Sequence, residues 1–215
     1  MERKVRKALS LIGDNVWKRL QRERKGQKAM IDVPEDGDFW AAQRGGFLGV
    51  LGGETNGLLM EGIDQASRLG LAVNFEMANQ QVLEYARTFN NEWWGKLEST
   101  TRNGLRTAIG THIESGAPLD TLKKNLVPLF GKKRAEMIAA TETTRLFGEG
   151  NRIAYMQAGV EMVEWHTTGF NVCPDCQQME EANPHPVQVA PPLHVRCHCW
   201  TVPISDGKVL EEVIG

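Results

Sequence analysis

Hydrophobic residues recur at helical spacing along most of the chain. Near the N-terminus, Val5, Leu9, Ile12, Val16 and Leu20 follow one another in steps of three and four residues, with basic residues between them. This pattern predicts a basic amphipathic helix. Two interpretations of it remain open: a surface helix that packs on its own domain, and an arm that docks on an acidic protein or on phosphate groups.

Two stretches interrupt the helical pattern. Residues 31–38 are acidic and rich in turn formers, which is typical of a linker. Residues 45–57 contain six glycines. A phosphate-binding loop requires Lys and Ser or Thr after its last glycine, whereas Leu58 and Leu59 follow Gly57 here. We therefore expect a mobile loop or hinge at 45–57 and no nucleotide site.

The helical pattern returns between residues 58 and 159. Turn formers and capping residues divide this stretch into successive helices. A first helix ends at Gly70, a second begins at Asn74, and a stripe of apolar residues at helical spacing ends at Ser115 and Gly116. Pro118 then opens a short helix that stops near Pro128. A long helix runs from Lys132 to Gly159.

One carboxylate lies on the apolar side of that long helix. Ile138, Glu142 and Leu146 are four residues apart, so Glu142 shares a face with two aliphatic residues. A partly buried carboxylate needs a partner, and Arg145 is the nearest candidate. We interpret Glu142 and Arg145 as a structural ion pair. A catalytic acid is the alternative, but no second carboxylate or nucleophile is placed with it.

The spacing of the apolar residues changes after Gly159. Residues 160–167 alternate between apolar and polar positions, which predicts a strand with Val163 and Trp165 on one face. Trp165 is therefore assigned a structural role. Residues 200–204 predict a second strand, and Pro203 would confine it to the edge of a sheet.

Composition adds a charge asymmetry. The 215 residues are 41% hydrophobic and 24% charged, which excludes collagen, a low-complexity disordered chain and a disulfide mini-protein. The net charge of −2 conceals a strongly basic segment, 1–28, with ten Lys and Arg against three acidic residues. No secretion signal or membrane span is expected. The candidate contacts to a partner or to nucleic acid are Arg3, Lys4, Arg6, Lys7, Lys18, Arg19, Arg22, Arg24 and Lys25.

All four cysteines lie in one short segment. Cys173 and Cys176 form a CxxC knuckle, and Cys197 and Cys199 follow a proline-rich loop. Two such pairs complete the tetrahedron of a structural Zn²⁺ site. We favour four cysteine ligands over a set in which His194 replaces one of them. A disulfide or redox pair, free buried thiols and a catalytic zinc are the alternatives.

These patterns together predict an α+β fold that is predominantly α-helical, with a helical body and a small C-terminal β/zinc-knuckle unit. The expected segments are a basic amphipathic N-terminal arm at 1–30, an acidic linker and Gly-rich loop at 31–57, the helical body at 58–159, and a strand with a Cys-rich metal-binding unit at 160–215.

Four short motifs occur in an order that is similar to a known family. They are AATETTR at 139–145, WHTT at 165–168, CPDC at 173–176 and PPLHVRCHC at 191–199. This series resembles the phage head-morphogenesis domain of the Mu F-like minor head proteins, over roughly residues 100–204. The chain departs from the family pattern at Ala140, where the family usually carries Arg, and at 195, 196 and 198.

The resemblance implies a protein of the virion without enzymatic activity. Such proteins act in head morphogenesis at the capsid interior or portal vertex, after synthesis in the host bacterial cytoplasm. The implied partners are portal and capsid or scaffold proteins, with viral double-stranded DNA as a further candidate and no membrane. Two other functions stay open: a stand-alone zinc-stabilised nucleic-acid-binding module, and a metal-dependent hydrolase or effector.

Overall fold

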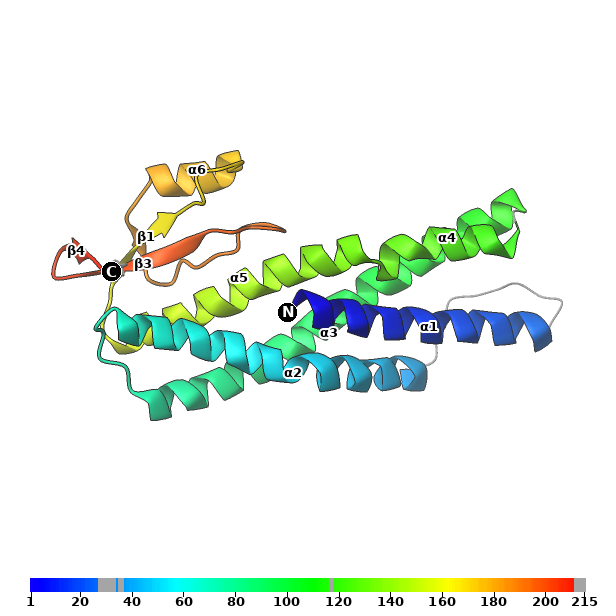
Figure 1. The fold of residues 1–215 in the computed structure, drawn as a ribbon, viewed down its shortest axis with the longest axis horizontal. Coiled ribbons are helices and arrows are strands. Elements are labelled where there is room, and N and C mark those ends of the chain that lie inside the picture. Colours follow the sequence, from blue (N-terminus) through cyan, green and yellow to red (C-terminus); the bar gives the residue numbers. More distant parts are fainter. Residues whose placement is uncertain (27–33, 35–36, 117, 211–215) are drawn as a thin grey trace. The chain divides into compact units, whose positions relative to one another are not determined.

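The computed structural model describes residues 1–26, 34, 37–116 and 118–210, except for the side chains of residues 23–26 and 119. The described chain is predominantly α-helical, with a small antiparallel sheet near the C-terminus, which confirms the predicted class (Figure 1). The elements are α1 (Glu2–Gly26), α2 (Gly37–Arg68), α3 (Phe75–Ser115), α4 (Leu119–Phe130), α5 (Lys132–Gln157), β1 (Met162–His166), α6 (Pro174–Glu181), β2 (His185–Pro186), β3 (Trp200–Ser205) and β4 (Lys208–Val209).

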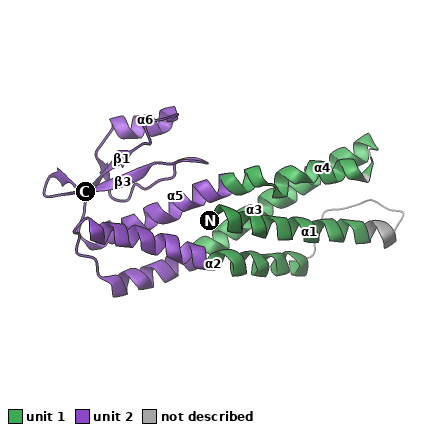
Figure 2. Ribbon diagram, viewed as in Figure 1, with its two compact units in different colours: residues 1–52, 88–136 green, residues 53–87, 137–215 purple. Residues whose placement is uncertain are grey.

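The chain forms two compact units, which Figure 2 shows in different colours. Unit 1 contains Met1–Gly52 and Thr88–Glu136, and unit 2 contains Gly53–Arg87 and Met137–Gly215. Helices α2, α3 and α5 each contribute to both units. The units therefore do not follow the order of the chain, on which the expected four segments were based.

Unit 1 buries the apolar side of α1. The five residues at helical spacing that the sequence indicated are all buried: Val5, Leu9, Ile12, Val16 and Leu20. They therefore form the side of α1 that packs against the rest of unit 1. Helix α1 lies beside α4 within this unit. Burial of each such aliphatic side chain contributes about 1.5–3 kcal/mol. Helix α1 is thus a packed part of unit 1, as the first of the two interpretations held.

The glycine-rich stretch is helical, and the expectation of a loop or hinge at 45–57 was wrong. Helix α2 continues through all six glycines from Gly37 to Arg68. Its buried residues are spaced by four, with Phe47, Leu51, Thr55 and Leu59 on one side. This apolar stripe outweighs the low helix propensity of glycine, because packing decides helix formation more strongly than propensity.

Unit 2 uses glycine for close helix packing. Helices α2 and α5 approach each other at Gly62 and Gly150. A Cβ atom at Gly150 would lie 2.1 Å from the carbonyl oxygen of Leu59, and one at Gly62 would lie 2.3 Å from that of Phe147. Neither backbone atom can move without displacing its helix. These two glycines therefore allow a contact that no other residue permits.

Several helix boundaries agree with the sequence. The Asn74 side chain accepts hydrogen bonds from the backbone N–H groups of Glu76 and Met77 at 3.1 Å, so it caps α3 as predicted. Gly159 follows α5 with a φ of 76°, a left-handed conformation that suits glycine. Pro128 lies inside α4, which ends two residues later at Phe130, close to the predicted stop near Pro128.

The sheet belongs to unit 2 and has the order β2-β1-β3-β4. All its strand pairs are antiparallel, and β1 pairs with β3 so that Trp165 lies opposite Thr201. Both predicted strands are present, but the expectation that Pro203 confines the second one to the edge of the sheet was wrong, since β3 lies between β1 and β4. The pairs with β4 involve the two residues after Pro203 and do not use Pro203 itself. Val163 and Trp165 are buried on the same face of β1, in agreement with the alternation read from the sequence. The sheet thus presents Trp165 to the cysteine segment.

Candidate metal centre

Helix α6 positions the first cysteine pair. Cys173 is the N-cap of this helix, and its sulfur accepts a hydrogen bond from the Cys176 backbone N–H at 3.4 Å. Pro174 occupies the first helical turn, where its missing N–H and fixed φ are favourable. Helix α6 was not expected from the sequence. A proline directly after a capping residue was the signal that would have found it.

Helix α5 holds the loop that carries the second pair. The Thr144 hydroxyl donates to the Cys197 carbonyl at 2.7 Å, and the Thr141 hydroxyl accepts from the Arg196 backbone N–H at 2.9 Å. Arg196 has a φ of 61°, which is uncommon for a residue with a side chain. The two threonines belong to the AATETTR motif, whose link to the cysteines was not predicted from the sequence.

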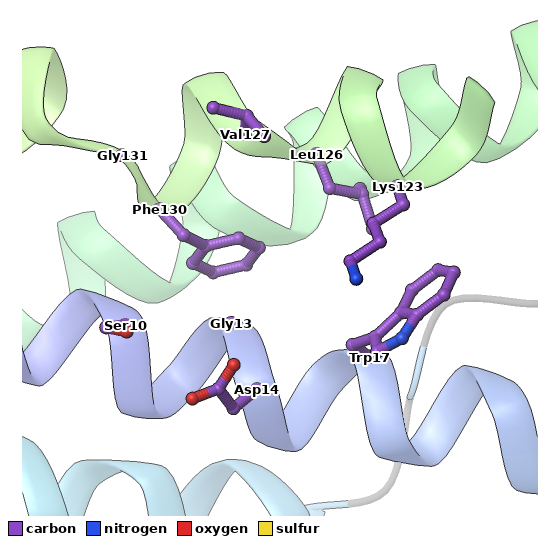
Figure 3. A pocket seen from close by; sticks show the side chains of 9 residues that line it. All are labelled: Ser10, Gly13, Asp14, Trp17, Lys123, Leu126, Val127, Phe130 and Gly131. Carbon is purple, nitrogen blue, oxygen red and sulfur yellow. The ribbon is translucent and has the colours of Figure 1, made fainter. Parts of the chain in front are cut away.

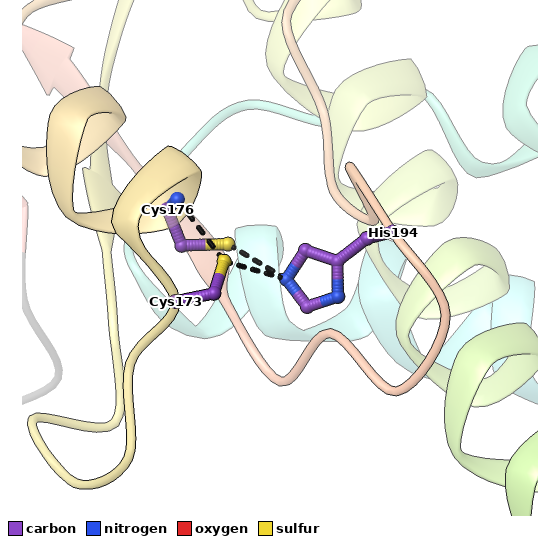
Figure 4. Close-up of side chains that lie close together, drawn as sticks. All are labelled: Cys173, Cys176 and His194. Atoms are coloured by element: carbon purple, nitrogen blue, oxygen red, sulfur yellow. Dashed lines mark hydrogen bonds between the residues drawn. The ribbon is translucent and has the colours of Figure 1, made fainter.

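The cysteine sulfurs and one imidazole nitrogen lie close together, as Figure 4 shows for three of the residues. The Nε2 atom of His194 is 3.1 Å from the sulfurs of both Cys173 and Cys176. The sulfurs of Cys176 and Cys197 are 3.8 Å apart. Two thiolates at about 2.3 Å from one tetrahedral zinc ion would be about 3.8 Å apart. The second separation therefore matches a shared ion.

Five potential donors form two overlapping groups. Cys173, Cys176 and His194 make one group, and Cys176, Cys197 and Cys199 make the other, with the donor atoms of each group within 4.8 Å of one another. Cys176 belongs to both. The cluster can hold a metal ion, and both ligand sets considered from the sequence draw on it. All four cysteines are free thiols in this structure.

Burial sets the chemistry of the thiols. Cys176, Cys197 and Cys199 are buried, whereas Cys173 is only partly so. Burial raises the pKa of Cys176 far above that of an ordinary thiol and raises the pKa of Cys199 to about 11. Negative charge on these sulfurs is unfavourable without a nearby cation. A bound metal ion supplies that cation, because metal ligation requires and stabilises the thiolate form.

Two polar side chains support the strand beside the cluster. The Asn183 amide accepts from the Trp165 backbone N–H at 2.6 Å and donates to the Trp165 carbonyl at 2.9 Å. Glu180 on α6 accepts from the backbone N–H and the hydroxyl of Thr167, both at 2.8 Å. These hydrogen bonds lower the pKa of Glu180. They connect α6 to the end of β1.

The cluster also borders a small cavity of about 180 Å³. Cys173, Cys176, His194 and Cys199 contribute to its wall. Phe170 lines it as well and is 78% exposed. The donors are thus covered on the side of the sheet and open toward this cavity.

The basic residues of α1 lie away from these cysteines along the chain, in unit 1. Arg3, Arg6, Lys7, Lys18 and Arg22 are exposed. Lys4 and Arg19 are partly buried. The side chains of Arg24 and Lys25 lie outside the described residues, as do residues 27–30 of the expected arm and most of the expected linker.

A groove of about 250 Å³ runs between α1 and α4 in unit 1 (Figure 3). The rings of Trp17 and Phe130 stand toward its two ends, and the Lys123 side chain extends between them. The Lys123 ammonium lies 5.8 Å from the centre of the Trp17 ring. Val127 on the rim is 60% exposed. This groove combines apolar surface with one basic and one acidic side chain, Lys123 and Asp14.

The predicted pair of Glu142 and Arg145 is formed in unit 2. The Arg145 Nε atom donates to the Glu142 carboxylate at 3.0 Å. The Glu142 side chain is 15% exposed and that of Arg145 is 39% exposed. The pair is separate from the groups of metal donors.

Comparison of the chain with protein-family models, with curated proteins and with solved structures gives no match. None of the described helices combines the length and apolar character that crossing a membrane requires.

Proposed function

We propose that the chain is a minor head protein of a tailed phage or prophage, acting in head morphogenesis as a non-enzymatic docking protein. One observation carries this proposal. Four motifs in family order meet at one cluster: Thr144 from the first, Trp165 from the second, Cys176 from the third and Cys197 from the fourth. A series of motifs that describes one structural unit is expected to converge in this way.

The metal of this proposal is a structural Zn²⁺ ion. Thiolate and imidazole donors suit zinc better than hard cations such as Mg²⁺ or Ca²⁺. Cys173, Cys176, Cys197, Cys199 and His194 are the residues that would hold it. Bound zinc would tie α6 to the loop before β3. X-ray absorption should give four protein ligands, whereas a metal-bound water would favour a hydrolase.

The α1/α4 groove supports a protein partner for docking. Trp17, Phe130 and Val127 offer apolar surface, and Lys123 adds positive charge. Aromatic side chains that fill or line a groove are typical of protein interfaces. The proposed partners are the portal and the capsid or scaffold proteins, in the virion at the capsid interior or portal vertex.

Particle analysis tests the head role. The gene should lie beside terminase and portal genes, and purified heads should contain the chain. Deleting the gene should abolish infectivity, and the wild-type gene should restore it. The variant Cys176→Ser should not restore it, whereas the surface variant Gly95→Ala should. Fully infectious particles that lack the chain would contradict the proposal.

The exposed basic residues of α1 favour one second candidate, a zinc-stabilised module that binds nucleic acid by itself. Arg3, Arg6, Lys7, Lys18 and Arg22 would contact phosphates, so affinity for duplex DNA should fall steeply with salt. Replacing Arg3, Arg6 and Lys7 by Gln should reduce both the affinity and the salt dependence. Absence of DNA binding at low salt would exclude this function and leave the protein-docking role.

A further inference from the structure

The indole N–H of Trp165 is a buried hydrogen-bond donor that makes no hydrogen bond in this structure. Trp165 is 0% exposed, so water cannot satisfy the donor from outside. An unsatisfied buried donor costs about 1–3 kcal/mol. The indole N–H therefore needs a hydrogen-bond acceptor, and the described side chains provide none in this structure.

The position of Trp165 is fixed from both sides. Its backbone N–H and carbonyl are both bonded to the Asn183 amide on one edge of β1. On the other edge, β1 pairs with β3, and Trp165 lies opposite Thr201. The indole therefore stays on the buried face of the sheet, and its donor cannot turn outward to find another partner.

The acceptors within reach are sulfur atoms. Trp165 packs in one buried cluster with Cys176, Cys197 and Cys199. Cys199 directly precedes β3, two residues before the partner of Trp165 in the sheet. Alternate residues of an extended segment point to the same face, so Cys199 shares the face of Thr201 and is a diagonal neighbour of Trp165, within reach of its large side chain.

We propose that the Trp165 indole N–H donates a hydrogen bond to the Cys199 sulfur when a metal ion holds that sulfur as a thiolate. This inference rests on the zinc centre of the proposed function. A neutral thiol is a weak acceptor, whereas a thiolate accepts strongly. Trp165 would then be a positioning residue that orients Cys199 and offsets part of its charge, as outer hydrogen-bond partners do at metal sites.

Nuclear magnetic resonance of the full chain tests this. The indole N–H resonance of Trp165, assigned by its disappearance in Trp165→Phe, should move downfield and exchange more slowly when one equivalent of Zn²⁺ is added. Because loss of the metal is expected to unfold residues 160–210, the chain loaded with ¹¹³Cd²⁺ separates the hydrogen bond from refolding. The Trp165 indole proton should show scalar coupling to the bound ¹¹³Cd, whereas that of Trp200, which is 38% exposed and stacks on His166, should not.

Co²⁺ binding gives a second reading. In Trp165→Phe, the sulfur-to-cobalt charge-transfer band should move to lower energy, and affinity for Co²⁺ should fall by about 10–100-fold. The matched control Trp200→Phe should leave both unchanged. If the wild-type chain binds one Co²⁺ but the Trp165 resonance does not respond and Trp165→Phe binds equally well, the hydrogen bond is excluded. Failure of the wild-type chain to bind Co²⁺ or Zn²⁺ would instead overturn the zinc centre and the hydrogen bond with it.

Discussion

Unit 1 and the C-terminal part of unit 2 are ordered by different chemistry. Unit 1 buries long helical stripes of aliphatic and aromatic side chains, such as Leu9 on α1 and Phe47 on α2. Between residues 160 and 210, three of the seven buried hydrophobic residues are cysteines. The small sheet and side chains bonded to backbone, such as Asn183 on Trp165, add to the order there. We therefore expect metal removal to affect these two regions very differently.

The largest effect should follow from Cys176→Ser, because Cys176 belongs to both donor groups. Structural zinc contributes about 10–16 kcal/mol of apparent folding free energy in small zinc peptides. Loss of the metal should therefore unfold residues 160–210 and leave α1 and α4 folded. Hydrogen exchange read by mass spectrometry would show protection lost in the first region and retained in the second.

Val187→Ala is the matched control for this variant. Val187 is buried in the same region but offers no ligand, so its truncation should cost about 1–3 kcal/mol and leave metal binding intact. Equal protection of residues 160–210 in Cys176→Ser and the wild-type chain would show that metal does not order this region.

The second effect concerns helix packing, which should not depend on metal. Gly150→Ala places a Cβ atom against the Leu59 carbonyl of α2. Overpacking of this kind costs about 1–3 kcal/mol, and the backbone contact puts this case at the upper end. Urea denaturation of the metal-loaded chain would measure the loss. Gly95→Ala on α3 is the control, since nothing lies within 4 Å of its Cβ position. A Gly150→Ala variant as stable as Gly95→Ala would contradict the close contact.

The sequence predicted the helical framework well because its signals are local. The apolar spacing around Leu9 and the capping residue Asn74 each act within a few residues, and both predictions were confirmed. The loop expected at 45–57 was wrong because glycine content was weighed above the four-residue spacing of Phe47, Leu51 and their successors. A buried stripe is a tertiary effect that overrides propensity.

The cysteines of the cluster were predicted from the sequence, but the side chains that hold the cysteine loop in place were not. CxxC spacing indicates donors that meet, because the two residues lie in one turn. The hydroxyls of Thr141 and Thr144 reach the cysteine loop across more than fifty positions of sequence. No local pattern specifies such a contact. The same holds for Asn183, whose amide takes the place of a strand partner for Trp165.

A smaller effect should separate the polar support of β1 from the metal. The two hydrogen bonds from Thr167 lower the pKa of Glu180, so its carboxylate stabilises the folded chain above the unfolded-state pKa. Glu180→Gln should lose about 1 kcal/mol at pH 7. Because a lowered pKa contributes stability that is lost on acidification, the difference between the two proteins should shrink as the pH falls below the ordinary value of 4.5.

Denaturant titrations of both proteins at matched pH values would measure this difference and cancel acid effects that they share. A constant difference between pH 7 and pH 3 would show that the charge on Glu180 does not contribute.

The smallest change in stability should come from replacing the glycines of α2 whose Cβ positions have no neighbouring atoms. Gly45 and Gly49 are exposed in the helix, and nothing lies within 4 Å of a Cβ atom added at either position. Alanine restricts the unfolded chain more than glycine does, so Gly45→Ala and Gly49→Ala should each stabilise the chain by about 0.5–1 kcal/mol. Urea denaturation followed by circular dichroism would detect this. Gly70→Ala, at a φ of 83°, should have the opposite sign. Destabilisation by Gly45→Ala would mean that this stretch of α2 is not helical in solution. The buried stripe through Phe47 would then stabilise α2 less than the buried side of α1 stabilises α1.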